Sequence, residues 1–137
     1  MESEMTSDYT FGATLNQPIE AVLARTETAL ADQGFGVLTR IDLAATLKAK
    51  LGIDRPPYLI LGVCNPGLAN LALDIDPLIG ALSPCSVVLR EDGGAGTRIE
   101  IPDPIAALAI TGSDAVGPVA TEAAERLRLV LDAAVAA

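Results

Sequence analysis

Two cysteines, each next to a proline-containing turn, are the residues whose types and surroundings point most directly to chemistry. Cys64 is followed by Asn65-Pro66, and Cys85 is preceded by Pro84. Proline fixes the backbone, and junctions between strands and loops are places where binding and catalytic residues concentrate. We therefore expect a functional site around Cys64, Asn65, Pro66 and Cys85.

The position of Cys64 suggests a reactive thiol. Asn65 is a good N-cap and Pro66 is favoured in a first helical turn, so a short helix is expected to begin directly after Cys64. The dipole and free N–H groups at a helix start favour a thiolate. If the strand that begins at Cys85 lies beside the strand that ends at Cys64, the two sulfurs could form a disulfide, act as a redox pair or bind a soft metal together. The alternative is inert packing, because free cysteine is often a small buried hydrophobe.

The absence of histidine narrows the possible chemistry further. It excludes Ser-His-Asp and Cys-His catalysis, HExxH zinc sites and histidine-ligated haem. Two thiols are an incomplete ligand set for zinc, so no metal site is predicted, and the sequence names no cofactor. Asp74 and Asp76 precede Pro77 and are more typical of a chain turn, with Asp76 as a cap, than of an acid and a base. Asp103 lies between two prolines, where we expect it to accept a turn hydrogen bond.

Composition excludes further classes of function. The 137 residues include 9 Lys and Arg against 18 Asp and Glu, a net charge of −9, and aromatic residues are only 3%. This charge repels a phosphate backbone and few rings are available for stacking on bases, so we expect no nucleic-acid partner. The acidic start at residues 1–5 lacks a secretory pattern and no apolar run is long enough for a membrane span, which predicts a cytoplasmic protein.

One stretch of this acidic chain is rich in positively charged residues. Residues 40–55 hold four of the nine cationic side chains, namely Arg40, Lys48, Lys50 and Arg55. This stretch is either a solvated helix face or a contact for an anion or a partner.

Hydrophobic periodicity predicts the elements that position these residues. Strands are predicted at 9–15, 35–41, 58–64, 85–91 and 97–101, the run at 58–64 being covered on both faces. Helices are predicted at 18–33, 43–51, 66–73, 77–82 and from 118 to the end. The glycine-rich turn at 92–96 joins two strands as a hairpin, whereas the periodicity of 102–117 assigns no element.

The order of elements predicts an α+β fold. We expect one domain over 9–137, preceded by a frayed segment at 1–8, with the pattern β-α-β-β-β-β-α and short inserted helices. The two longer helices would cover one face of a largely antiparallel sheet. The other face would then be exposed to solvent, covered by the short helices or paired with a second subunit. The last of these makes a homodimer a reasonable expectation.

Several separated motifs occur together in the order that is typical of one family. They are Gly34-Phe35-Gly36-Val37-Leu38, Ile41-Asp42, Thr46-Leu47-Lys48, Pro57-Tyr58, Leu61-Gly62, Cys64-Asn65-Pro66, Leu68-Ala69, Pro84-Cys85 and Val87-Val88. Over about residues 9–134 the chain resembles the domain of unknown function 302 family. The resemblance implies an α+β fold similar to the TATA-box-binding-protein-like class and a tendency to form homodimers, but no established reaction.

The same resemblance bears on the site. The recurrent residues of the family correspond to Cys64, Asn65, Pro66 and Cys85. Many members carry His or Tyr where this chain has Asn70, so a helper group for thiol or metal chemistry would be missing here. DNA binding does not follow from the fold, because function depends on the site and the charge is wrong for DNA.

Three functions remain open. The first is a small, cytoplasmic, homodimeric and non-enzymatic module, in which a pocket near Cys64, Asn65 and Cys85 binds a small molecule or responds to redox state. The second is a thiol-dependent enzyme with Cys64 as nucleophile and Cys85 as the resolving thiol. The third is a purely structural partner domain.

Overall fold

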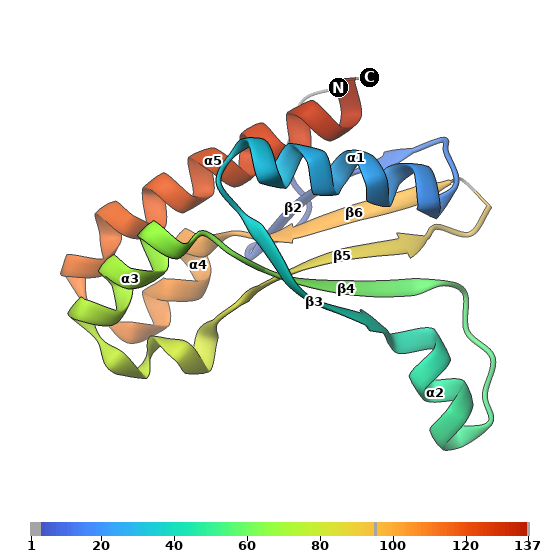
Figure 1. Cartoon of the computed structure of the whole chain (residues 1–137), viewed down its shortest axis with the longest axis horizontal. Helices are drawn as coiled ribbons and strands as arrows, with labels where there is room; N and C mark the ends of the chain where they lie inside the picture. The colour runs from blue at the N-terminus through green and yellow to red at the C-terminus, as the bar shows by residue number, and fades with distance from the viewer. Residues whose placement is uncertain (1–3, 95, 137) are drawn as a thin grey trace.

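The computed structural model describes residues 4–94 and 96–136, in which six strands form one antiparallel sheet (Figure 1). The strands are β1 (Glu4–Met5), β2 (Thr10–Leu15), β3 (Gly36–Asp42), β4 (Tyr58–Cys64), β5 (Cys85–Glu91) and β6 (Thr97–Pro102). Their order across the sheet is β1-β2-β6-β5-β4-β3, and every neighbouring pair is antiparallel. The predicted α+β class and antiparallel sheet are confirmed.

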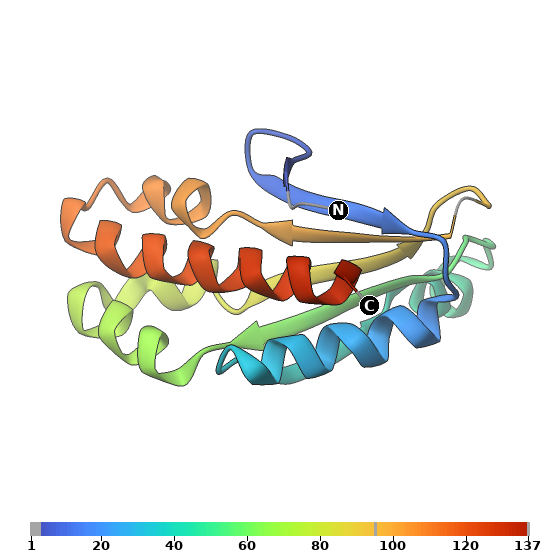
Figure 2. The same ribbon diagram turned by 90° about the horizontal axis from the view of Figure 1, so that it is seen from above.

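Two long helices, α1 (Ile19–Asp32) and α5 (Gly117–Ala136), lie side by side over one face of the sheet (Figures 1 and 2). The shorter segments are α2 (Leu43–Leu51), α3 (Pro66–Ile75), η1 (Pro77–Leu82), α4 (Pro104–Leu108), η2 (Ala109–Thr111) and η3 (Asp114–Val116). Figure 1 shows α3 and α4 at one end of the sheet and α2 at the other. No helix in the described part of the chain is long and apolar enough to cross a membrane.

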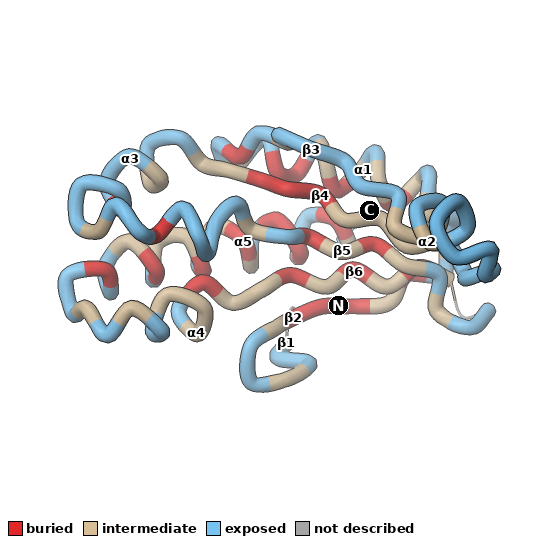
Figure 3. Tube along the Cα trace, turned by 90° about the horizontal axis from the view of Figure 1, so that it is seen from below, coloured by how far each residue is buried: buried red, intermediate tan, exposed pale blue. Residues whose placement is uncertain are grey.

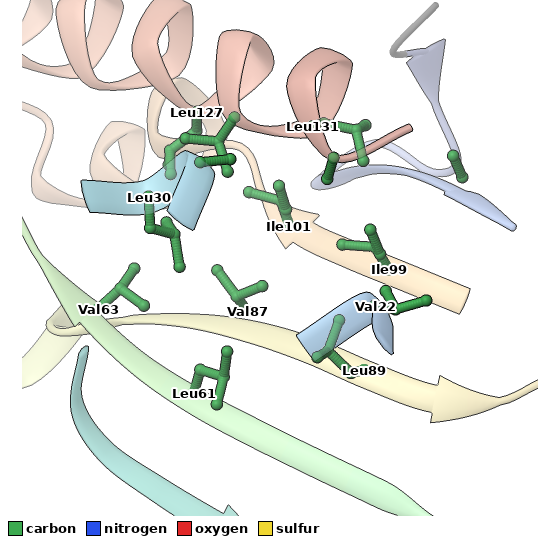
Figure 4. Packing of buried hydrophobic residues seen from close by; sticks show 14 of the residues in the cluster. Val22, Leu30, Leu61, Val63, Val87, Leu89, Ile99, Ile101, Leu127 and Leu131 are labelled. Atoms are coloured by element: carbon green, nitrogen blue, oxygen red, sulfur yellow. The ribbon is translucent and has the colours of Figure 1, made fainter. Parts of the chain in front are cut away.

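The main core fills the space between the sheet and the two long helices. Alternate strand residues point into it, as the predicted period of two requires. The largest buried side chains are Phe11, Leu30, Leu61, Leu89, Ile99, Ile101, Leu127 and Leu131, all of them below 2% exposed, and Figure 4 shows most of them meeting. Burying each such side chain contributes about 1.5–3 kcal/mol, so this layer holds the sheet and helices together.

A polar residue followed by proline begins three of the short segments. The side chains of Asn65, Asp76 and Asp103 accept hydrogen bonds from the first-turn backbone N–H groups of α3, η1 and α4. The capping predicted for Asn65 and Asp76 is confirmed. The same pattern at Asp103 explains how the unassigned stretch 102–117 folds, because it starts α4 at Pro104.

The amino-terminal segment differs from the expectation of a frayed end at 1–8. Residues 1–3 lie outside the described residues, but Glu4–Met5 form β1 and pair with Phe11 and Gly12 of β2. The turn that follows is held by Ser7, whose hydroxyl accepts from the backbone N–H groups of Tyr9 and Thr10. Local hydrogen bonds of this kind carry no hydrophobic period, so periodicity did not reveal them.

β3 and β4 also depart from their predicted burial. Alternation predicted Phe35, Val37, Thr39 and Ile41 on one half-buried face, but a bulge between Val37 and Thr39 shifts the register, and β3 is exposed at nearly every position (Figure 3). β4 is buried only over residues 61–63, because its neighbour β3 is the edge strand of the sheet and covers little of it. The segment at 77–82 forms as predicted but is a 3₁₀ helix.

Candidate functional site

Both cysteines line one cavity, at the end of the sheet where β4 finishes and β5 begins. The cavity has a volume of about 300 Å³. Its wall is formed by the strand ends together with α3, η1, α4 and the first turns of α5, and it includes Phe35, Leu68, Ala69, Leu108, Val119 and Ala123. It lies between the main core and a small second cluster of Ala72, Ile79 and Val116. The cavity is thus a gap between two packed layers.

The sheet register shows where the two cysteines lie in the fold. Cys85 is the pairing partner of Val63, and Cys64 is the next residue along β4, where it pairs with Gly36 of β3. The cysteines therefore lie on adjacent strands, one residue out of register. Both are free and half-buried, so the disulfide that the sequence left open is not formed.

Asn65 holds the helix that forms one wall. Its Oδ1 accepts from the backbone N–H of Leu68 at 3.2 Å, and its Nδ2 donates to the carbonyl of Gln33 at 3.3 Å. Arg126 of α5 donates to the same carbonyl at 3.2 Å. One backbone oxygen thus links the end of α1 to α3 and α5. Asn65 lines the cavity, but both ends of its side-chain amide already form hydrogen bonds within the protein. Pro66 begins α3 and does not line the cavity.

The pKa of Cys85 bears on what this thiol can do. Burial raises the pKa of the Cys85 thiol, and the nearby charge of an ionised Cys64 raises it further. Cys85 therefore stays protonated at neutral pH. A resolving cysteine attacks as the thiolate, so this environment opposes the role that the enzyme hypothesis gives to Cys85.

The raised pKa of Cys85 predicts a pH-dependent stability. In the unfolded chain this thiol ionises at its ordinary pKa, whereas the folded chain holds the proton to higher pH, so the folded state loses stability as pH rises through that interval. Urea unfolding at pH 7 and at about pH 9.5 should show a larger loss for the wild type than for Cys85→Ala. Equal losses in the two proteins would mean that Cys85 ionises as easily in the folded chain.

The basic stretch at 40–55 borders a second cavity, at the opposite end of the sheet. This cavity has a volume of about 480 Å³, against about 300 Å³ for the first. Its lining contains side chains of both charges, with Glu20, Asp42 and Asp54 beside Lys48 and Arg55. Lys48 Nζ lies 2.9 Å from Asp54, and Arg40 forms an ion pair with Glu27 of α1. With three carboxylates against two cations, this lining does not favour an anion.

The residues around the first cavity define what chemistry it can support. Within residues 4–94 and 96–136, no three His, Cys, Asp or Glu side chains gather as a metal site would require. Asn70 is exposed and lies outside the lining, so a His or Tyr at this position would not enter the cavity from α3 as it stands. Sequence reasoning missed α4, since the run at 105–110 had no assigned period. It predicted the helix α5 but not that the first turns of α5 line this cavity.

Comparisons with known proteins agree with the fold. The family model described as Domain of unknown function DUF302 matches residues 11–134. A crystal structure of an uncharacterized conserved protein DUF302 from Bacillus stearothermophilus is similar, with 29% sequence identity, a TM-score of 0.86, and coverage of 93% of this chain and 98% of that one. No curated protein matches the chain. The resemblance seen in the sequence motifs is confirmed: this chain belongs to the DUF302 family.

Proposed function

We propose that the protein is a binding module for a small, uncharged and mainly apolar molecule, which occupies the cavity between α3, α4 and the ends of β4 and β5. The observation that carries the proposal is the cavity itself, which brings Cys64, Asn65 and Cys85 together with apolar side chains from four helical segments. We place this activity in the cytoplasm, where thiols such as Cys64 and Cys85 remain reduced.

Size and lining support a small apolar occupant. A volume of about 300 Å³ lies at the lower end of the range for small-molecule pockets, which are mostly apolar with a few polar groups that fix orientation. The polar side chains in the lining are Asn65 and Ser83, next to the two thiols. A ligand with one hydrogen-bonding end and an apolar body fits this distribution.

Charge excludes an ionised ligand. No lining residue is Asp, Glu, Lys or Arg, so a carboxylate, phosphate or ammonium group inside the cavity would lose its water without gaining a counter-ion. That desolvation costs several kcal/mol, and the lining offers no charged partner to offset it.

Thiol chemistry at Cys64 is the second candidate, because Cys64 lies in the cavity wall directly before α3. A hydroperoxide would oxidise the Cys64 thiolate to a sulfenic acid and release the corresponding alkoxide, which takes a proton from water. Attack by the Cys85 thiolate would then form the disulfide and release hydroxide. The raised pKa of Cys85 slows that second step, so a redox response has less support than reversible binding.

Serine substitutions separate binding from thiol chemistry. We expect the wild type to bind the uncharged dye N-phenyl-1-naphthylamine saturably, with one dye per chain, in a fluorescence titration. Cys64→Ser and Cys85→Ser should each change the affinity by less than about tenfold, because one wall atom changes at a cost near 1 kcal/mol.

The other outcomes favour the other functions. If Cys64→Ser alone abolishes the interaction and the wild type gains mass covalently from a thiol-reactive ligand, Cys64 is a nucleophile. If the wild type does not bind the dye at all, the proposal fails and a structural role for the domain gains support.

A further inference from the structure

We propose that the second cavity, which has a volume of about 480 Å³, binds an α-amino acid with an apolar side chain in its zwitterionic form. The proposal stands on two charged side chains without partners and on an apolar floor in the same cavity. It does not depend on the proposed function, because the cavity lies at the end of the sheet beside α2, away from α3 and α4 (Figure 1).

Three segments form this cavity. They are the first turns of α1, the start of α2 with the last residue of β3, and residues 54–59, which lead into β4. Asp42 at the end of β3 pairs with Leu59 of β4, so α2 begins next to the start of β4. Figures 1 and 2 both show the beginnings of α1 and α2 at the same end of the molecule. The cavity therefore lies where these beginnings meet the sheet.

The floor of the cavity is apolar. Ile19, Leu23 and Leu59 line the cavity and also pack against the main core, but each is only partly buried. Tyr58 stands beside them and is also partly buried. These side chains keep apolar surface exposed to water, and covering that surface favours a ligand with an apolar group.

The charged groups of the lining divide into partnered and unpartnered ones. Lys48 Nζ lies 2.9 Å from Asp54 Oδ1, and Asp42 Oδ1 accepts from the backbone N–H of Ala45 at 2.9 Å. The side chains of Glu20 and Arg55, in contrast, form no ion pair and no hydrogen bond with any other residue that the structure describes. One carboxylate and one guanidinium are thus left for a ligand.

The loop that carries Arg55 is held on both sides. Asp54, the residue before it, is the partner of Lys48 on α2. Pro56-Pro57 follow and restrict the backbone, and the carbonyl of the second proline accepts from the backbone N–H of Glu91 at 3.0 Å. The backbone at Arg55 is therefore positioned beside the cavity before any ligand arrives.

These features determine the class of ligand. A guanidinium binds a carboxylate through two parallel hydrogen bonds, and the carboxylate of Glu20 accepts from an ammonium group. A purely anionic ligand would face the three carboxylates of the lining, and a purely cationic ligand would leave Arg55 without a partner. A zwitterion supplies both charges, and an apolar side chain on it covers the floor.

The first test uses the wild type and L-phenylalanine at about pH 6, where carboxylates and amines are both charged. Methyl NMR should show saturable shifts at Leu23 and Leu59, and none at Leu68 and Val119 of the first cavity. L-phenylalaninamide lacks the carboxylate and N-acetyl-L-phenylalanine lacks the ammonium group. Each should bind about three- to fivefold more weakly than L-phenylalanine, because one exposed charge contact is lost.

Substitutions assign each contact to one side chain. Arg55→Gln should weaken L-phenylalanine about three- to fivefold and leave the affinity for L-phenylalaninamide unchanged, because that compound has no carboxylate to lose. Glu20→Gln should weaken L-phenylalanine to a similar extent and leave the affinity for N-acetyl-L-phenylalanine unchanged. Both residues are exposed, so these variants keep the fold.

Lys50→Gln and Glu125→Gln are the matched controls. They remove the same charges from exposed positions that do not line the cavity, so they should leave all three affinities unchanged. No saturable shift at Leu23 and Leu59, equal wild-type affinities for the three compounds, or an equal loss in a control would each overturn the proposal. Failure of the dye to bind in the first cavity would contradict only the proposed function.

Discussion

Ala69→Phe should lower the affinity for N-phenyl-1-naphthylamine by at least about tenfold, and this is the largest effect that we expect on binding. The Ala69 side chain lines the cavity from α3, and a phenyl ring added there enters a space of only about 300 Å³. The dye must then give up contacts or force the wall to move, which costs about 1–3 kcal/mol and corresponds to a factor of roughly 10 to 100. Fluorescence titration measures the loss.

Asn70→Phe is the matched control for this substitution. Asn70 follows Ala69 on the same helix, but it is exposed and does not line the cavity. The same ring is added in the same helix, so effects of Phe on α3 itself are similar while the cavity stays open. Unchanged affinity in Ala69→Phe, or equal loss in both variants, would show that the dye binds elsewhere.

Gly96→Ala should destabilise the fold by about 3–5 kcal/mol, the largest effect on stability that we expect from adding a single carbon. Gly96 ends the turn between β5 and β6 with φ of +115°, a conformation that favours glycine. A Cβ at this position would also lie within van der Waals overlap of the Leu15 carbonyl, at the end of β2. The hairpin and β2 would have to separate to admit it.

Gly94→Ala separates the cost of the positive φ from the cost of the overlap with the Leu15 carbonyl. Gly94 lies in the same turn with φ of +89°, but a Cβ there has open space around it. We expect it to cost about 1–2 kcal/mol, the conformational part alone. Urea unfolding curves of the two variants and the wild type give the difference. If Gly96→Ala costs no more than Gly94→Ala, the close approach of the turn to β2 does not constrain the fold.

Local signals in the sequence predicted most of the fold because they act over a few residues. Asn65 and Asp76 cap the segments that they were expected to cap, and the hairpin around residues 92–96 forms between the predicted strands. These features depend on neighbouring residues along the chain, so one sequence is enough to show them. The sequence left open whether Cys64 and Cys85 lie on adjacent strands, and the pairing of β4 with β5 decides that they do.

Features set by register and distant packing could not be predicted in this way. The bulge after Val37 moves Thr39 and Ile41 to the opposite face of β3, and no alternation pattern marks where a bulge falls. The cavity needs the first turns of α5 to meet α3 across more than forty residues of chain. Its volume depends on how Val119 and Leu108 pack there, which spacing along the chain does not determine.

The central claim is that a small apolar molecule binds between α3, α4 and the ends of β4 and β5. Methyl NMR during a titration with N-phenyl-1-naphthylamine tests it most directly, because it reports the place of binding together with its strength. We predict large, saturable shifts at Leu68, Leu108 and Val119, which line the cavity, and none at exposed Leu129. Shifts confined to methyl groups outside the cavity, or no shifts while the dye is in excess, would contradict the account.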